Sequence, residues 1–91
     1  MGNISSQVKE VVASNYCDKA HAKLQSKDYR GAIEYYTKAI ELKPDVVALH
    51  NRAFVKGKLK DWHGAIEDYT KAIEDAKIKH QAFENPPTEN N

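Results

Sequence analysis

The chain has a single cysteine, only three prolines and no long hydrophobic run. Cys17 alone cannot form an internal disulfide, which excludes the disulfide framework of small secreted domains and favours a reducing compartment. The apolar stretches are two to four residues long, whereas a membrane-spanning helix needs about 20 apolar residues. No signal-peptide hydrophobic region is present either. The sequence therefore predicts a cytoplasmic protein that does not cross a membrane.

The chain also lacks an excess of charge of either sign. Fourteen Lys and Arg face thirteen Asp and Glu, a formal net charge of +1. This balance argues against nucleic acid as a partner, because nucleic-acid-binding domains carry a concentrated basic surface. A length of 91 residues allows one small domain.

Two segments of the chain repeat each other closely. Residues 27–41 align with residues 60–74 at a constant offset of 33, and both contain Gly-Ala-Ile-Glu and Tyr-Thr-Lys-Ala-Ile-Glu. Similarity at such a period is typical of stacked supersecondary units. In each copy the apolar residues recur at steps of three and four, which predicts an amphipathic helix. These residues are Ala32, Ile33, Tyr36, Ala39 and Ile40, and Ala65, Ile66, Tyr69, Ala72 and Ile73.

The boundaries of the helices can be predicted from capping and breaking residues. Asp28 and Asp61 precede the two repeated helices and are expected to be their N-caps. An upstream apolar pattern predicts one long helix from about residue 6 to about residue 26. Pro44 ends the second helix, and a third begins near Val46. The sequence predicts four helices in two antiparallel pairs.

These segments resemble the tetratricopeptide repeat. The run Tyr-Thr-Lys-Ala-Ile-Glu-Leu-Lys-Pro, which ends at Pro44, matches the second helix and closing proline of that motif. The resemblance covers about residues 13–76. Lys23 and Lys56 depart from it, since the family prefers large apolar residues there. The offset of 33 is also shorter than the usual repeat of about 34 residues.

The resemblance implies an all-α fold of antiparallel helix-turn-helix hairpins stacked as a short right-handed solenoid. Lys77 replaces the closing proline of the second copy, so the last helix is expected to continue. The predicted divisions are a flexible N-terminus at 1–5, a domain at 6–84 with repeats at about 13–45 and 46–78 and an extension to about 84, and a disordered tail at 85–91.

In this family, the first helices of successive hairpins line a concave groove that binds an extended peptide or a partner helix. The resemblance therefore implies a non-catalytic adaptor for a protein partner. Phe54 is the strongest single candidate contact, because aromatic anchors fill pockets well. The candidate groove residues are Cys17, Asp18, His21 and Leu24 in the first repeat and Val47, His50, Asn51, Phe54 and Lys58 in the second.

Some family members grip the acidic C-terminal tail of chaperones with Lys, Arg and Asn side chains. Asn51 matches one position of this clamp, whereas Cys17 and His21 stand at positions that carry Lys and Asn. Two repeats are present rather than three. Chaperone binding is therefore a minor alternative.

The N-terminal sequence Met-Gly-Asn-Ile-Ser-Ser fits the pattern for N-myristoylation at Gly2. A cloning remnant is the competing explanation. One myristoyl chain gives only marginal membrane attachment, and no polybasic run is present to reinforce it. A peripheral membrane location is thus an open alternative to a purely cytoplasmic one.

Two further alternatives follow from the residues. Cys17, His21 and His50 could approach one another as a metal or thiol site, but no orienting acid or phosphate-binding loop accompanies them, and the acidic residues are expected on solvated helix surfaces. No enzyme activity, cofactor or metal is predicted. The other alternative is a structural subunit that assembles through its helix ends, as a homodimer or in a larger complex, because two repeats leave apolar ends uncovered.

Overall fold

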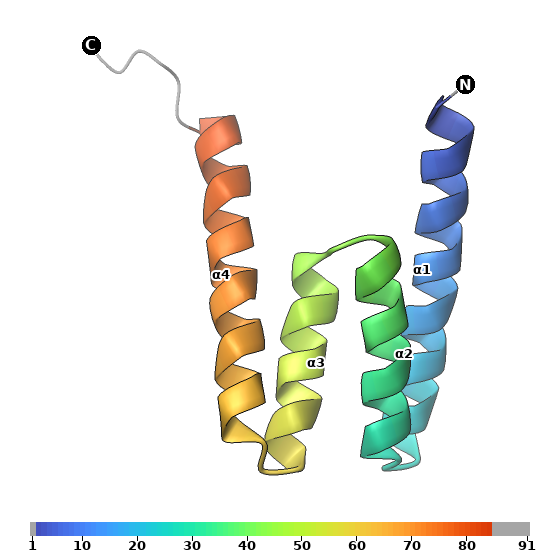
Figure 1. Ribbon diagram of the computed structural model, residues 1–91, viewed down its shortest axis with the longest axis vertical. Coiled ribbons are helices and arrows are strands. Elements are labelled where there is room, and N and C mark those ends of the chain that lie inside the picture. The colour runs from blue at the N-terminus through green and yellow to red at the C-terminus, as the bar shows by residue number, and fades with distance from the viewer. Residues whose placement is uncertain (1, 85–91) are drawn as a thin grey trace.

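The computed structural model describes the backbone of residues 2–84 and the side chains of residues 7–78. Four helices follow one another: α1 (Gly2–Gln25), α2 (Tyr29–Leu42), α3 (Val46–Lys58) and α4 (Trp62–Glu84). Successive helices run antiparallel, and α1 and α4 both project beyond the α2–α3 connection in the same direction (Figure 1). The predicted all-α fold, with a long first and an extended last helix, is confirmed.

Both predicted caps are present. An Asp28 carboxylate oxygen accepts a hydrogen bond from the backbone N–H of Gly31 at 3.0 Å, and Asp61 accepts one from Gly64 at the same distance. Each bond satisfies one of the backbone donors that a helix start leaves unpaired. The two repeated helices therefore begin where the sequence placed them.

The turns within the two hairpins are also equivalent. Lys27 and Lys60 have φ of 64° and 65°. In each turn the following Asp N–H donates to the carbonyl five residues earlier, at 2.8 and 2.9 Å. A left-handed conformation costs a residue with a side chain about 1–2 kcal/mol. Both copies adopt this unfavourable conformation at the same position, so the two copies match in backbone conformation as well as in sequence.

The ends of the chain differ from the expectations in one respect. Helix α1 begins at Gly2 rather than near residue 6, because residues 2–6 contain no proline and their Asn and Ser side chains cost a helix well below 1 kcal/mol each. Helix α4 continues past Lys77 to Glu84, as the missing proline predicted. The tail at 85–91 lies outside the described residues, and the division into repeats of about 13–45 and 46–78 stays a prediction.

The centre of the core joins the two hairpins. Ala20 of α1, Ala32 and Tyr36 of α2 and Val55 of α3 form one buried cluster. Since Val55 belongs to the second hairpin, its burial among side chains of the first fixes how the hairpins stack. Leu24, Tyr29 and Ile33 pack partly buried around this cluster.

The isoleucines of the repeated apolar stripe are covered in one hairpin only. Ile33 and Ile40 on α2 are partly buried, whereas their equivalents on α4, Ile66 and Ile73, are 64% and 56% exposed. Helix α3 covers the isoleucines on α2. No described part of the chain covers those on α4, although Ala65 and Ala72 of the same stripe are buried. The second hairpin thus ends in an open apolar surface.

Candidate protein-binding groove

The candidate groove lies where α1 and α3, the first helices of the two hairpins, come together. The His21 ring nitrogen Nε2 of α1 lies 3.5 Å from the Asn51 amide nitrogen of α3. This contact joins two residues that the sequence assigned to the same groove from different repeats. The face that carries His21 and Asn51 is called the groove face below.

Tyr36 of α2 forms the floor beneath these residues. Its side chain is completely buried, and the His21 ring meets it edge to face with 5.6 Å between centroids. Its hydroxyl has no hydrogen-bond partner; the nearby Asn51 amide favours the ionised form only weakly and does not reach bonding geometry. Burial, with a contribution from nearby Cys17, raises the pKa of Tyr36 to about 12.

Cys17 lies on the same face in a setting that keeps its thiol protonated. Partial burial raises the pKa of Cys17, and the negative charges of Asp45 and Asp18 raise it further. A reactive cysteine needs the opposite, because the thiolate is the nucleophile. Among residues 7–78, no three His, Cys, Asp or Glu side chains come together as a metal site. The geometry therefore gives no support to the thiol or metal alternatives.

A cleft of about 280 Å³ opens beside Cys17, between α1 and the start of α3. Small side chains form most of its walls, and an ion pair between Glu10 and Lys43, 3.3 Å long, lies at its edge. Sequence reasoning missed this cleft because it depends on small residues, which give no distinctive pattern. The lining residues are Glu10, Ala13, Ser14, Cys17, Ala39, Lys43, Asp45 and Ala48.

Three other predicted residues are exposed, although no contact ties them to one another. Asp18 on α1 is exposed, and Val47 on α3 is 61% exposed. His50 is also exposed and meets the Tyr69 ring of α4 edge to face at 5.2 Å. Tyr69 is the repeat equivalent of Tyr36, so each hairpin places a tyrosine of its second helix behind a histidine of its first.

The remaining candidates lie elsewhere. Leu24 packs against the core cluster. Lys58 places its ammonium 5.1 Å from the centre of the Phe54 ring, and both residues line a second, larger cleft of about 530 Å³ between α3 and α4. We call this the end cleft; its residues are Ala53, Phe54, Gly57, Lys58, Trp62, Ala65, Ile66 and Tyr69.

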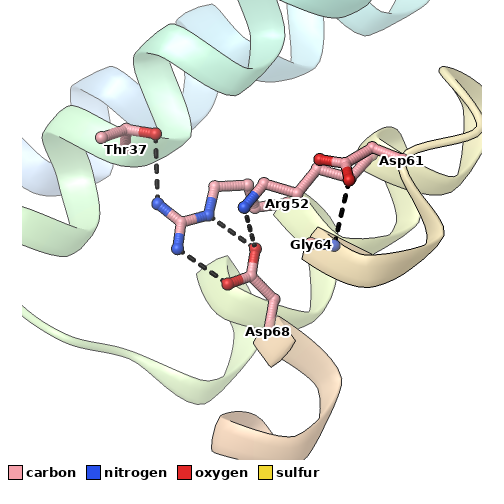
Figure 2. Close-up of polar contacts among 6 residues, drawn as sticks. Thr37, Arg52, Asp61, Gly64 and Asp68 are labelled. Atoms are coloured by element: carbon pink, nitrogen blue, oxygen red, sulfur yellow. Dashed lines mark hydrogen bonds and ion pairs between the residues drawn. The ribbon is translucent and has the colours of Figure 1, made fainter. Parts of the chain in front are cut away.

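A buried polar cluster holds α3 in place against its neighbours (Figure 2). Arg52 of α3 donates to the Thr37 hydroxyl of α2 at 3.1 Å and pairs with Asp68 of α4, which Lys56 also contacts at 3.1 Å. Asp68 is buried, so the expectation that the acidic residues lie on solvated surfaces is wrong here. The sequence did contain a signal for this residue. In the alignment of the two copies, Asp68 falls at the position of Tyr35, one of the few places where the copies differ.

These features define a helical-hairpin solenoid whose first helices share an exposed face, a class of protein-interaction scaffold. Residues 13–46, which contain the first of the two copies, match the family model described as the tetratricopeptide repeat. This match supports the resemblance found in the sequence for that part of the chain. Neither the curated proteins nor the solved structures gave a match to the chain. The tetratricopeptide repeat is a protein-interaction fold, so the match supports a protein–protein interaction module in general terms.

In the part of the chain that the structure describes, no helix combines the length and the apolar character needed to span a bilayer.

Proposed function

We propose that the chain is an adaptor that binds a peptide or helix of a protein partner along the groove face. The observation that carries this proposal is the approach of α1 and α3 at His21 and Asn51. It places polar side chains of both repeats on one face, with His21 exposed and Asn51 partly exposed, beside a cleft of about 280 Å³. A ligand lying across both helices can donate to and accept from these side chains and place an apolar group in the cleft.

The test starts with a phage-displayed peptide library selected on the full chain, followed by titration of a selected peptide by fluorescence anisotropy. We expect His21→Ala and Asn51→Ala each to weaken binding several-fold, because each removes a side chain that can form a hydrogen bond with the peptide, worth about 1 kcal/mol. The matched controls are Glu34→Ala and Glu67→Ala, exposed positions on the second helices. Equal affinities for groove and control variants would contradict the groove assignment.

The chaperone-tail alternative is distinguished by the terminal carboxylate of the ligand. A carboxylate clamp needs charge-assisted donors, and the groove face carries Cys17 and His21 at two of the required places. We expect acidic peptides with a free C-terminus to bind no more tightly than the same peptides amidated. A strong preference for the free carboxylate would favour the co-chaperone function.

The membrane tether proposed for Gly2 needs a separate experiment. Co-expression with an N-myristoyltransferase, followed by intact-mass measurement, tests whether the chain gains one myristoyl group. A Gly2→Ala variant is the control, because the modification requires an N-terminal glycine. An unchanged mass would remove the tether from the proposal while leaving groove binding untouched.

A further inference from the structure

The end cleft is the repeat equivalent of the place where α3 packs on the first hairpin. Val55 of α3 lies buried among Ala20, Ala32 and Tyr36. A shift of 33 residues converts these three into Ala53, Ala65 and Tyr69, which all line the end cleft. The same shell of side chains thus appears twice in the chain, once filled by a helix and once open.

The side chains of the end cleft are exposed because none of the described helices lies over them. Trp62 and Ile66 are 61% and 64% exposed, whereas their equivalents Tyr29 and Ile33 pack partly buried against the core. Large apolar side chains that gather in one open cleft indicate an interaction surface. Val8 and Val11 are also exposed, but they line a separate and smaller cleft of about 270 Å³ on α1.

We propose that the end cleft binds an amphipathic α-helix of a partner protein, which lies on the second hairpin as α3 lies on the first. The side chains by which α3 packs on the first hairpin indicate which side chains this partner helix must carry. Helix α3 buries Leu49 and Val55 and places Arg52 between them, 3.1 Å from Thr37. Since Thr70 repeats Thr37, the bound helix carries aliphatic residues six apart with an Arg or Lys midway.

Two differences between the hairpins specify further side chains of the bound helix. Gly57 stands where the first hairpin has Leu24, so the cleft accepts a side chain larger than valine, such as leucine or phenylalanine. Phe54 stands where the first hairpin has His21, whose partner on α3 is Asn51. The bound helix therefore presents an apolar residue at the Asn51 position.

A second copy of this chain, stacked head to tail, does not meet these requirements. Its α1 would present Tyr16, Lys19 and Ala22 at the positions of Leu49, Arg52 and Val55. Tyr16 is already stacked on Tyr35, with 6.0 Å between ring centroids, and Ala22 is too short to fill the cleft. The proposed occupant is therefore a partner helix with the pattern above rather than α1 of a second copy, and this proposal does not depend on binding at the groove face.

The probe for the test is a synthetic peptide of residues 45–59, which is α3 with its N-cap and ending in Leu59. Short isolated helices are marginal in water, so a hydrocarbon staple joins positions 47 and 54, whose side chains are exposed in α3. A second peptide carries Val55→Leu to fill the space left at Gly57, and a third carries Val55→Asp. Trp62, the single tryptophan of the chain, reports occupancy directly because the peptides contain none.

We expect a saturable blue shift of Trp62 emission, with the leucine peptide binding several-fold tighter than the valine peptide and the aspartate peptide not binding. Gly57→Leu restores the residue of the first hairpin and fills the cleft, and it should weaken binding at least tenfold. Ile66→Asp should act in the same direction. The matched control is Val8→Asp, which changes an exposed apolar residue far from the cleft and should leave affinity unchanged.

Loss of binding in the Gly57→Leu variant would not be due to unfolding, because this variant is expected to fold. A side chain at this position first meets Trp62, at 3.9 Å from Cβ, and leucine favours a helix over glycine, so the variant should melt no lower than wild type. Unchanged affinity in Gly57→Leu would overturn the proposal, as would the absence of any saturable shift. Sedimentation equilibrium that shows a dimer with Trp62 shielded would overturn it in favour of self-association.

Discussion

Arg52 grips Asp68 with two parallel hydrogen bonds: Nε donates to one carboxylate oxygen at 2.7 Å and Nη2 to the other at 2.8 Å. Asp68 is only 5% exposed, and the same guanidinium reaches Thr37 on the other hairpin. One side chain of α3 thus fixes this helix against both α2 and α4. The bidentate geometry sets an orientation that apolar packing alone would leave less defined.

Loss of the carboxylate should destabilise the fold markedly. Asp68→Asn leaves Arg52 and Lys56 without their partner, and removal of one member of a buried ion pair costs on the order of 3 kcal/mol. Asp75→Asn is the control, because its contact with Lys71 is 4.0 Å long and lies at the surface, with the Lys71 side chain 62% exposed. This contact should contribute less than about 1 kcal/mol. Urea unfolding measures both variants. Similar losses in the two would contradict the role of the buried pair.

Stability should fall in acid because of the same residue. Burial raises the pKa of Asp68, but the hydrogen bonds and charges of Arg52 and Lys56 lower it by more, to a net value below 3.8. In the unfolded chain this carboxyl binds a proton at higher pH than in the folded chain. Its stabilisation is therefore complete above the ordinary pKa and is lost as the pH falls through the lowered value.

The check is a series of urea unfolding curves between neutral pH and about pH 2.5, for wild type and Asp68→Asn. The variant should lose less stability in acid than wild type. Some pH dependence should remain, because the hydrogen bond from Gly31 also lowers the pKa of the Asp28 cap. Identical pH dependence in the two proteins would show that Asp68 does not carry the effect.

Removal of the Tyr36 hydroxyl should not harm the fold. The group is buried without a partner, and a buried unpaired polar group costs about 1–3 kcal/mol. Tyr36→Phe should therefore leave the free energy of unfolding unchanged or raise it by about 1 kcal/mol. Thermal and urea unfolding measure this. A loss of more than about 1 kcal/mol would mean that the hydroxyl is paired in solution.

Substitution by alanine should change stability differently at two helical glycines, Gly57 and Gly64. At Gly57 a new Cβ meets only Trp62, at 3.9 Å, so Gly57→Ala should stabilise α3 by about 1 kcal/mol. At Gly64 the Cβ would collide with the Asp61 carboxylate and displace the cap, which costs about 1 kcal/mol and cancels the gain. Denaturant midpoints of the paired variants test this difference. An equal gain in both would show that the Asp61 cap does not need a glycine there.

Local features of the sequence predicted much of the fold. Asp28, Asp61 and Pro44 act on backbone groups within a few residues of themselves, so the helix boundaries near them were predictable. The start of α1 was predicted less well, because the residues before position 6 neither cap nor break a helix. His21 and Asn51 were assigned to one face through the family resemblance, since they come from different repeats and the spacing within either helix cannot relate them.

The clefts and the buried charge were not predictable in this way. Asp68 lies three residues after buried Ala65 and four before buried Ala72, but a carboxylate is not expected on a buried helix face. Only Arg52 and Lys56, on another helix, make its burial favourable. The cleft beside Cys17 forms because small residues from three helices meet. Such meetings depend on the packing angle between helices, which a single helix does not encode.

The sequence by itself determined four helices, their caps and a period of 33 residues, because those features depend on interactions between near neighbours in the chain. Tertiary structure alone decided that Ile33 is covered while the equivalent Ile66 is 64% exposed. The two isoleucines sit in the same local sequence, Gly-Ala-Ile-Glu, and differ only in whether another helix lies over them. A repeat specifies the face that must be covered, and the stacking of hairpins decides which copy of that face remains open.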